Sequence, residues 1–133
     1  MSDNKNATGS MTALRIALVI IGLIFIFGIY PQTVVWPSGW SWGHGHSHYL
    51  MMIIGIYATL GVFLLIAARN PLAHSSLIWF TVVSSVVHAA IMADQALEPG
   101  HHLHLIGDVP ALIFVAVLLG MLTPRGAAAR RVG

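Results

Sequence analysis

The chain has 133 residues and a mass of 14.3 kDa, with 57% apolar residues, 8% charged residues and a mean hydropathy of +0.84. Because a soluble domain has about 25% charged residues, this composition excludes an ordinary water-soluble domain and a disordered chain, and favours a lipid-embedded protein. The isoelectric point near 9.5 comes from six Lys and Arg against four Asp and Glu, which excludes a nucleic-acid-binding surface. Cysteine is absent, which excludes disulfides and thiolate metal sites.

The chain begins with a polar segment, residues 1–10, which we expect to be a disordered tail. An apolar stretch follows over residues 11–30, interrupted by Arg15, and we expect Pro31 to end it. A secretory signal peptide is the alternative interpretation of this stretch. Because no small-x-small cleavage site follows it, we favour an uncleaved membrane span.

Three further apolar stretches cover residues 48–68, 72–93 and 103–123. Each is close to the roughly 20 residues that a helix needs to cross a bilayer. Apolar and polar residues do not alternate in them, so we expect helices rather than barrel strands. The predicted fold is an all-α, integral membrane, four-helix up-down bundle, with a single domain over residues 11–123 and a disordered basic tail over residues 124–133.

The positions of the basic residues predict the orientation of the bundle. With four spans, all six fall on the same side of the membrane: Lys5, Arg15, Arg69, Arg125, Arg130 and Arg131. The positive-inside rule therefore predicts that both termini lie inside. We expect a bacterial inner membrane, with the lipid bilayer as the main partner and a homo-oligomer or a larger membrane complex as the assembly.

Histidine is the unusual residue of this chain, with eight copies. Seven fall on the predicted outer side, three before the second span, three before the fourth span, and one within the third span. Imidazole and carboxylate ligands without thiolates suit a transition metal, and we expect copper or zinc. The candidate metal ligands are His44, His46, His48, Met52, His88, Met92, His101, His102, His104 and Asp108.

Helical spacing groups some of these candidates. His101, His104 and Asp108 are spaced i, i+3, i+7 and share one face of a helix that begins near His101. In this interpretation Pro110 produces a kink. The alternative is a shorter helix that Asp108 caps, with Pro110 in its first turn. We favour the longer helix, because the shorter one spans only about 21 Å.

The second and third spans contain a repeated pattern. His48 and Met52 are four residues apart, as are His88 and Met92, so two antiparallel helices can present imidazoles and thioethers at similar depth. The alternative roles are structural. His88 then bonds a neighbouring helix, and the methionines fill the core.

The predicted function is that of a metal carrier, buffer or accessory subunit. Alternatives are a structural membrane protein without a metal, a pH sensor or a transporter. A b-type cytochrome with one haem between His88 and His48 or His104 is a further alternative. His74 and His88 resemble the spacing in di-haem membrane cytochromes b, but His74 has no partner histidine in another span.

An enzyme is the remaining alternative. His101, His102 and His104 resemble part of a histidine box of membrane di-iron hydroxylases and desaturases. The other boxes of that family are absent from the chain, so we expect no catalytic residues.

Overall fold

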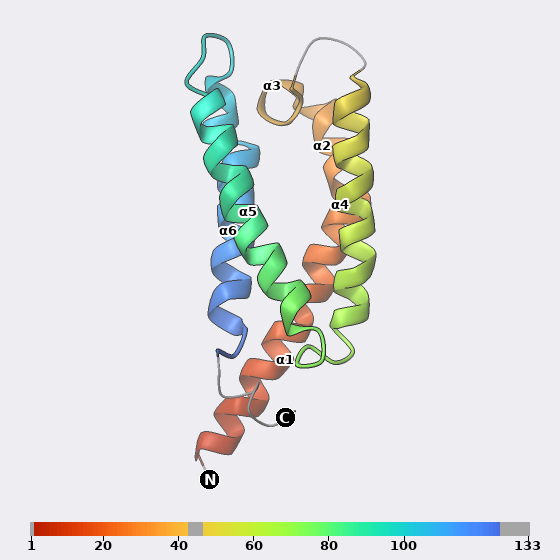
Figure 1. The fold of residues 1–133 in the computed structure, drawn as a ribbon, viewed down its shortest axis with the longest axis vertical. Helices are drawn as coiled ribbons and strands as arrows, with labels where there is room; N and C mark the ends of the chain where they lie inside the picture. The colour runs from red at the N-terminus through yellow and green to blue at the C-terminus, as the bar shows by residue number, and fades with distance from the viewer. Residues whose placement is uncertain (1, 43–46, 126–133) are drawn as a thin grey trace.

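The computed structural model describes residues 2–42 and 47–125, and these residues form helices and no strands. In chain order the elements are α1 (Ser2–Leu23), the π-helical turn η1 (Ile24–Gly28), α2 (Ile29–Val35), α3 (Pro37–Trp40), α4 (His48–Ala67), α5 (Ser75–Gln95), the 3₁₀ turn η2 (His102–Leu105) and α6 (Asp108–Leu122). Figure 1 shows that the long helices run roughly parallel to the long axis of the molecule.

Four helical segments are long and apolar enough to cross a membrane. They are Asp3–Val35 with 33 residues, His48–Ala67 with 20, and Ser75–Gln95 and His102–Leu122 with 21 each. At 1.5 Å per residue, even the shortest spans about 30 Å, the thickness of the hydrocarbon layer. The prediction of an all-helical chain with four segments long and apolar enough to cross a membrane is therefore confirmed.

The first helical segment is longer at both ends than the sequence predicts. Residues 2–10, expected to be a loose tail, are the first turns of α1, where the hydroxyl of Thr8 donates to the Asn4 carbonyl at 2.9 Å. At the other end the helix continues past Pro31 to Val35. The π-helical turn η1 interrupts the regular hydrogen-bond pattern just before, so Pro31 lies in the first turn of α2, where a missing N–H is tolerated.

The helices form two pairs, in which α4 lies along α1 and α5 lies along α6. The backbones of α1 and α4 touch at two glycines, since a Cβ on Gly22 would lie 2.8 Å from the Gly61 carbonyl oxygen. Small residues allow this close approach, which in lipid supplies the attraction between helices.

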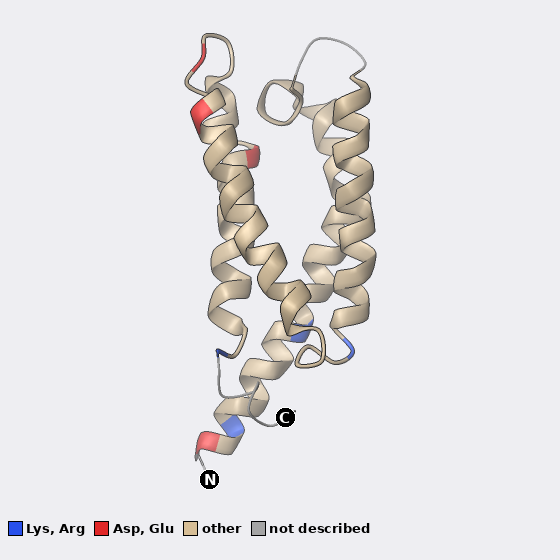
Figure 2. Ribbon diagram, in the orientation of Figure 1, with Lys and Arg blue, Asp and Glu red and all other residues tan. Residues whose placement is uncertain are grey.

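The two pairs join at the end of the molecule that carries Arg15, Arg69 and Arg125, which we call the arginine end. Figure 2 shows the described Lys and Arg residues gathered there. The α1 helix contacts α6 as well as α4. The largest fully buried aliphatic side chains come from all four spans: Leu14, Leu18, Leu64, Ile78 and Leu119. This core holds the two pairs together.

At the opposite end, which carries His48, His101, His102 and His104 and which we call the histidine end, the pairs diverge (Figure 1). There α3 packs against η2, so closely that a Cβ on Gly107 would clash with the Gly39 carbonyl oxygen. The fourth helix begins at Asp108, directly after this contact. The favoured longer helix with a kink at Pro110 is therefore wrong, because the tight, non-helical backbone at Gly107 interrupts it and Pro110 occupies a first-turn position.

Candidate functional site

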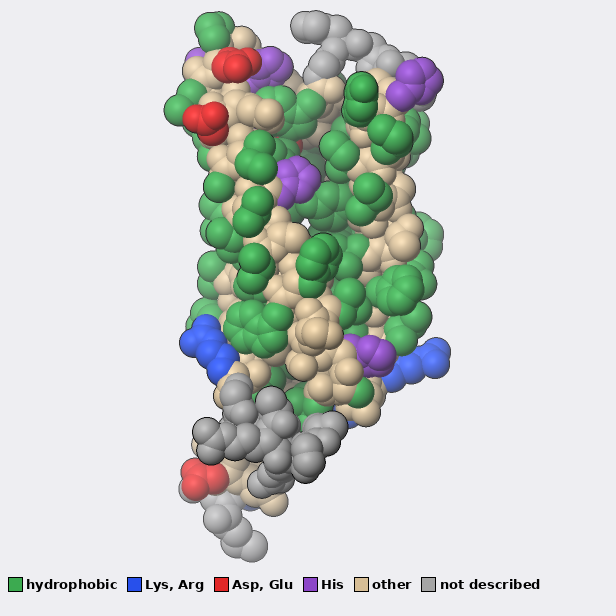
Figure 3. Space-filling view, in the orientation of Figure 1, with side chains coloured by type: hydrophobic (Ala, Val, Ile, Leu, Met, Phe, Trp, Pro, Cys, Tyr) green, Lys and Arg blue, Asp and Glu red, His purple; other side chains and the backbone are tan. Residues whose placement is uncertain are grey.

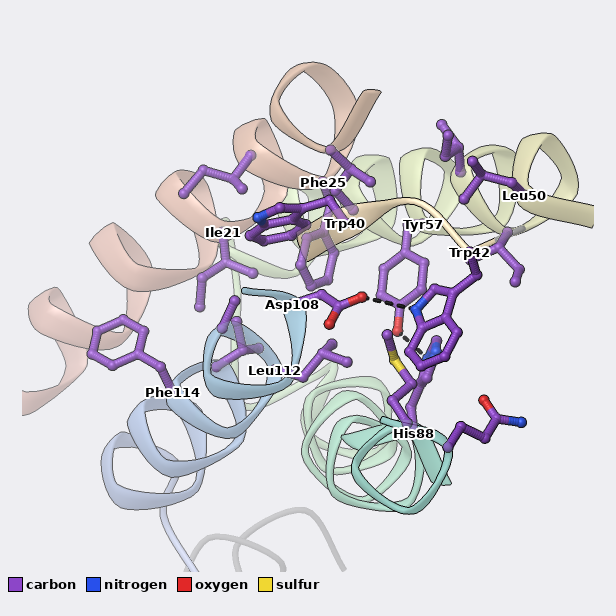
Figure 4. A pocket seen from close by; sticks show the side chains of 18 of the residues that line it. Ile21, Phe25, Trp40, Trp42, Leu50, Tyr57, His88, Asp108, Leu112 and Phe114 are labelled. Atoms are coloured by element: carbon purple, nitrogen blue, oxygen red, sulfur yellow. Dashed lines mark hydrogen bonds between the residues drawn. The ribbon is translucent and has the colours of Figure 1, made fainter. Parts of the chain in front are cut away.

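A cavity of about 800 Å³ lies between the two helix pairs, on the histidine side of the core. Its walls are mainly aliphatic and aromatic side chains from every span, among them Ile21, Phe25, Ile53, Leu112 and Phe114. Figure 3 shows the molecular surface hollowed between α5 and α4, and Figure 4 shows Phe25, Tyr57 and Asp108 grouped together, whereas Phe114 points away from them. The cavity exists because α4 and α5 make few contacts where the pairs diverge.

One polar pair bridges this gap. Tyr57 Oη on α4 and His88 Nδ1 on α5 share a hydrogen bond of 2.6 Å, drawn in Figure 4. The ring of Phe25 meets the Tyr57 ring edge to face, with 5.1 Å between the centroids, and this contact fixes the tyrosine. Both polar side chains line the cavity, so the pair presents a polar group inside an apolar wall.

A second polar group is the carboxylate of Asp108, at the start of α6. Its Oδ2 atom accepts a hydrogen bond from the Trp42 indole N–H at 3.0 Å and another from His104 Nδ1 at 2.9 Å. The Asp108 residue is only 5% exposed. Its other oxygen, Oδ1, is buried and has no hydrogen-bond partner within the described residues. Because Asp108 is one of the residues that line the cavity, this buried and unused acceptor lies beside it.

Stacked rings close the histidine end around this carboxylate. The Trp42 indole lies over the His104 imidazole, with ring centroids 3.9 Å apart and planes inclined by 21°. The His101 ring lies beside the same indole, with centroids 5.2 Å apart. His104 is 1% exposed, so the stack and the two bonds to Asp108 form one buried unit that links the segment after α3 to η2 and α6.

The structure brings together part of the predicted ligand set. His101 and His104 lie next to each other, and His104 bonds Asp108, even though these residues belong to a 3₁₀ turn and a helix start rather than to one long helix. His88 and Met92 line the same cavity, and Met92 is buried against Leu112 and its neighbours.

The other predicted ligands lie elsewhere. Met52 is 56% exposed on another face of α4, and His48 is exposed at the start of that helix, so the two do not meet His88 and Met92 in the cavity. The imidazole of His102 donates from Nδ1 to the Ala96 carbonyl at 3.0 Å. His44 and His46 lie outside the described residues.

Metal binding therefore stays a prediction. Among residues 2–42 and 47–125, no three His, Asp or Glu side chains are placed to hold one metal ion. A site that includes His44 and His46 falls outside these ranges.

Two site residues were missed from the sequence, Trp42 and Tyr57. Trp42 precedes the second span in a loop without a recognisable motif, and its N–H is the donor that fixes Asp108. Tyr57 lies in the middle of α4, whereas tyrosines of membrane proteins gather at the two interfaces. That unusual depth was the available signal that Tyr57 has a polar partner within the bundle.

Comparison with known proteins gives a family but no activity. No curated protein and no solved structure shows significant similarity to the chain. Residues 8–133 match a family of unknown function, DUF6632. Because this match covers both helix pairs and every residue of the cavity wall, the chain belongs to the family of unknown function DUF6632.

Proposed function

We propose that this membrane protein binds a small amphipathic molecule, one with an apolar chain and a polar head, in the cavity between its helix pairs. The observation that carries the proposal is the cavity itself, with a volume of about 800 Å³, apolar walls and a few convergent polar groups. Pockets for small molecules have volumes of about 300–1,000 Å³ and the same pattern of lining.

The shape of the cavity supports a chain-like ligand. Along α6 its lining runs from Asp108 to Leu118, which is ten residues of helix, or about 15 Å. The polar groups lie toward the histidine end, and the wall toward the arginine end is apolar. A ligand with its head near Asp108 and its chain along α6 places each part against matching chemistry.

The opening between α4 and α5 supports entry from the lipid (Figure 3). The outward faces of these helices carry exposed apolar residues such as Ile56 and Val83, as expected for helices in hydrocarbon. A molecule dissolved in the bilayer reaches the cavity through this opening without crossing water.

The proposed setting is an up-down bundle in a bacterial inner membrane. The described Lys and Arg residues gather at the arginine end, which we place on the cytoplasmic side by the positive-inside rule (Figure 2). The histidine end with its cavity then lies toward the outer leaflet. Its exposed aromatic residue Tyr49 suits the headgroup layer.

A matched pair of variants tests this proposal. Ile53 lines the cavity, whereas Ile56, one turn further along α4, is 69% exposed and lies on another face. Ile53→Trp fills the cavity, and Ile56→Trp adds the same side chain to the lipid-facing surface. Organic extraction of the purified proteins, followed by mass spectrometry, measures the molecule that each has retained.

We expect an approximately equimolar amphipathic molecule in the wild-type chain and in Ile56→Trp, and its loss from Ile53→Trp. Equal amounts in the two variants, or no retained molecule in folded wild-type protein, would contradict the proposal.

A further inference from the structure

We propose that the head of the bound molecule carries a hydrogen-bond donor, a hydroxyl or a protonated amine, which bonds Oδ1 of Asp108. This inference rests on the proposed function and names the chemical class of its ligand. It starts from the one oxygen of the cavity wall that is buried and without a partner among the described residues.

The carboxylate is held so that only one of its oxygens is used. Trp42 and His104, whose rings are stacked on each other, both donate to Oδ2, and these two bonds hold the carboxyl group in place. Oδ1 is left in the buried wall without a donor. A buried acceptor without a partner carries an uncompensated desolvation penalty, so a donor supplied by the ligand removes an existing penalty as well as forming a bond.

The charges around the cavity favour the same kind of head. Two acidic residues line it, Asp108 and the exposed Glu98, and no described Lys or Arg does. The described basic residues lie at the arginine end, at the other end of the molecule (Figure 2). A hydrogen-bond donor or a cation on the ligand therefore meets acceptor groups there, while a carboxylate or phosphate head finds no described Lys or Arg to pair with.

The free oxygen also discriminates against heads that only accept hydrogen bonds. An ether or ketone oxygen beside Oδ1 would place two sets of lone pairs in contact and leave both groups unsatisfied. The Tyr57 and His88 side chains already share one hydrogen bond, so their presence does not remove this conflict at Asp108. The preference for a ligand head that donates a hydrogen bond thus depends on Oδ1 of Asp108.

Three probes with the same chain test the inference: dodecanol, dodecylamine and the methyl ether of dodecanol. The protein is placed in phosphatidylcholine nanodiscs, because maltoside detergents carry hydroxyl groups and choline carries no N–H. Trp40 and Trp42 line the cavity, so tryptophan fluorescence reports occupancy. We expect the alcohol or the amine to bind the wild-type chain about tenfold more tightly than the ether.

The matched variants are Asp108→Asn and Asp94→Asn. In Asp108→Asn the amide oxygen can keep the bonds to Trp42 and His104, and the amide nitrogen then takes the place of Oδ1. The preference for a donor should fall to near unity in this variant. Asp94 is exposed on α5 and does not line the cavity, so Asp94→Asn should keep the tenfold preference.

Equal affinity of the ether and both donors in the wild-type chain would overturn the inference, and this comparison needs no variant to fold. A preference that persists in Asp108→Asn would overturn it too. In either case all three probes still bind, and Ile53→Trp still blocks them, so the proposed function stands. If no probe binds folded wild-type protein, the proposed function fails together with the inference.

Discussion

The arginine end and the histidine end of this molecule differ in how closely their helices pack. At the arginine end, aliphatic side chains of all four spans are fully buried, and α1 and α4 cross with their backbones in contact at Gly22 and Gly61. At the histidine end the two helix pairs diverge, and the space between the pairs is a cavity with polar groups on its wall. A small four-span protein thus separates the half that joins its helix pairs from the half that leaves room for a ligand.

This division predicts which substitutions affect folding and which affect binding. Changes to the core at the arginine end should weaken the packing between the pairs most, because this core buries aliphatic side chains from all four spans. Changes at the histidine end should leave the helices assembled and alter the cavity.

The largest effect should come from a large-to-small change in the core. Ile78 on α5 is fully buried, whereas Ile91 on the same helix is 54% exposed. We expect Ile78→Ala to lower the free energy of unfolding by about 3 kcal/mol, because it leaves a cavity between the pairs. Ile91→Ala should lower the free energy of unfolding far less, since this side chain lies on the exposed face of α5, where lipid or detergent fills the space. Thermal unfolding in one detergent compares the two, and equal losses would contradict a core confined to buried positions.

The free energy of unfolding should fall by a smaller amount when α1 and α4 are forced apart. A Cβ on Gly61 would lie 2.5 Å from the Gly22 carbonyl oxygen, but a Cβ on Gly55, in the same helix, meets nothing within 4 Å. We expect Gly61→Val to destabilise the protein by about 2 kcal/mol through overpacking.

Gly55→Val is the matched control, and it should leave the melting temperature nearly unchanged. If both valines were tolerated, the close approach of the two backbones would not be needed for the fold.

The smallest effect on folding should come from the histidine side. Tyr57→Phe removes the hydrogen bond to His88 and keeps the ring against Phe25, so we expect a loss of about 1 kcal/mol. Tyr49 also lines the cavity but is 77% exposed, which makes Tyr49→Phe the control.

The two tyrosine variants should differ more in the retention of the bound molecule than in melting temperature. If Tyr57→Phe lowered the free energy of unfolding as much as Ile78→Ala, contacts at the histidine end would also be needed to stabilise the fold.

The spans could be predicted from the sequence because long apolar runs have few alternatives in lipid. The residues at which the spans begin and end could not be predicted. Pro31 signals a stop, but the π-helical turn before it lets the helix continue, and Gly107 stops the fourth helix only because the backbone of Gly39 lies against it. Both outcomes depend on backbone geometry that the sequence does not encode locally.

The candidate site could be predicted only in part, because some of its contacts are local in the sequence and others join distant residues. His104 and Asp108 are four residues apart, so local spacing brings them together. Trp42 reaches Asp108 across 66 positions and Tyr57 reaches His88 across 31, and no periodicity links such distant residues. The cavity itself arises from the divergence of two helix pairs, which is a property of the assembled fold.

The side opening between α4 and α5 has a consequence for how such a site fills. A ligand that arrives through it is drawn from the plane of the bilayer, so its supply follows its mole fraction among the lipids and not its concentration in water. Occupancy then rises when the same amount of ligand is confined to less membrane. Under the proposed function, occupancy of the cavity therefore follows the composition of the membrane around the protein.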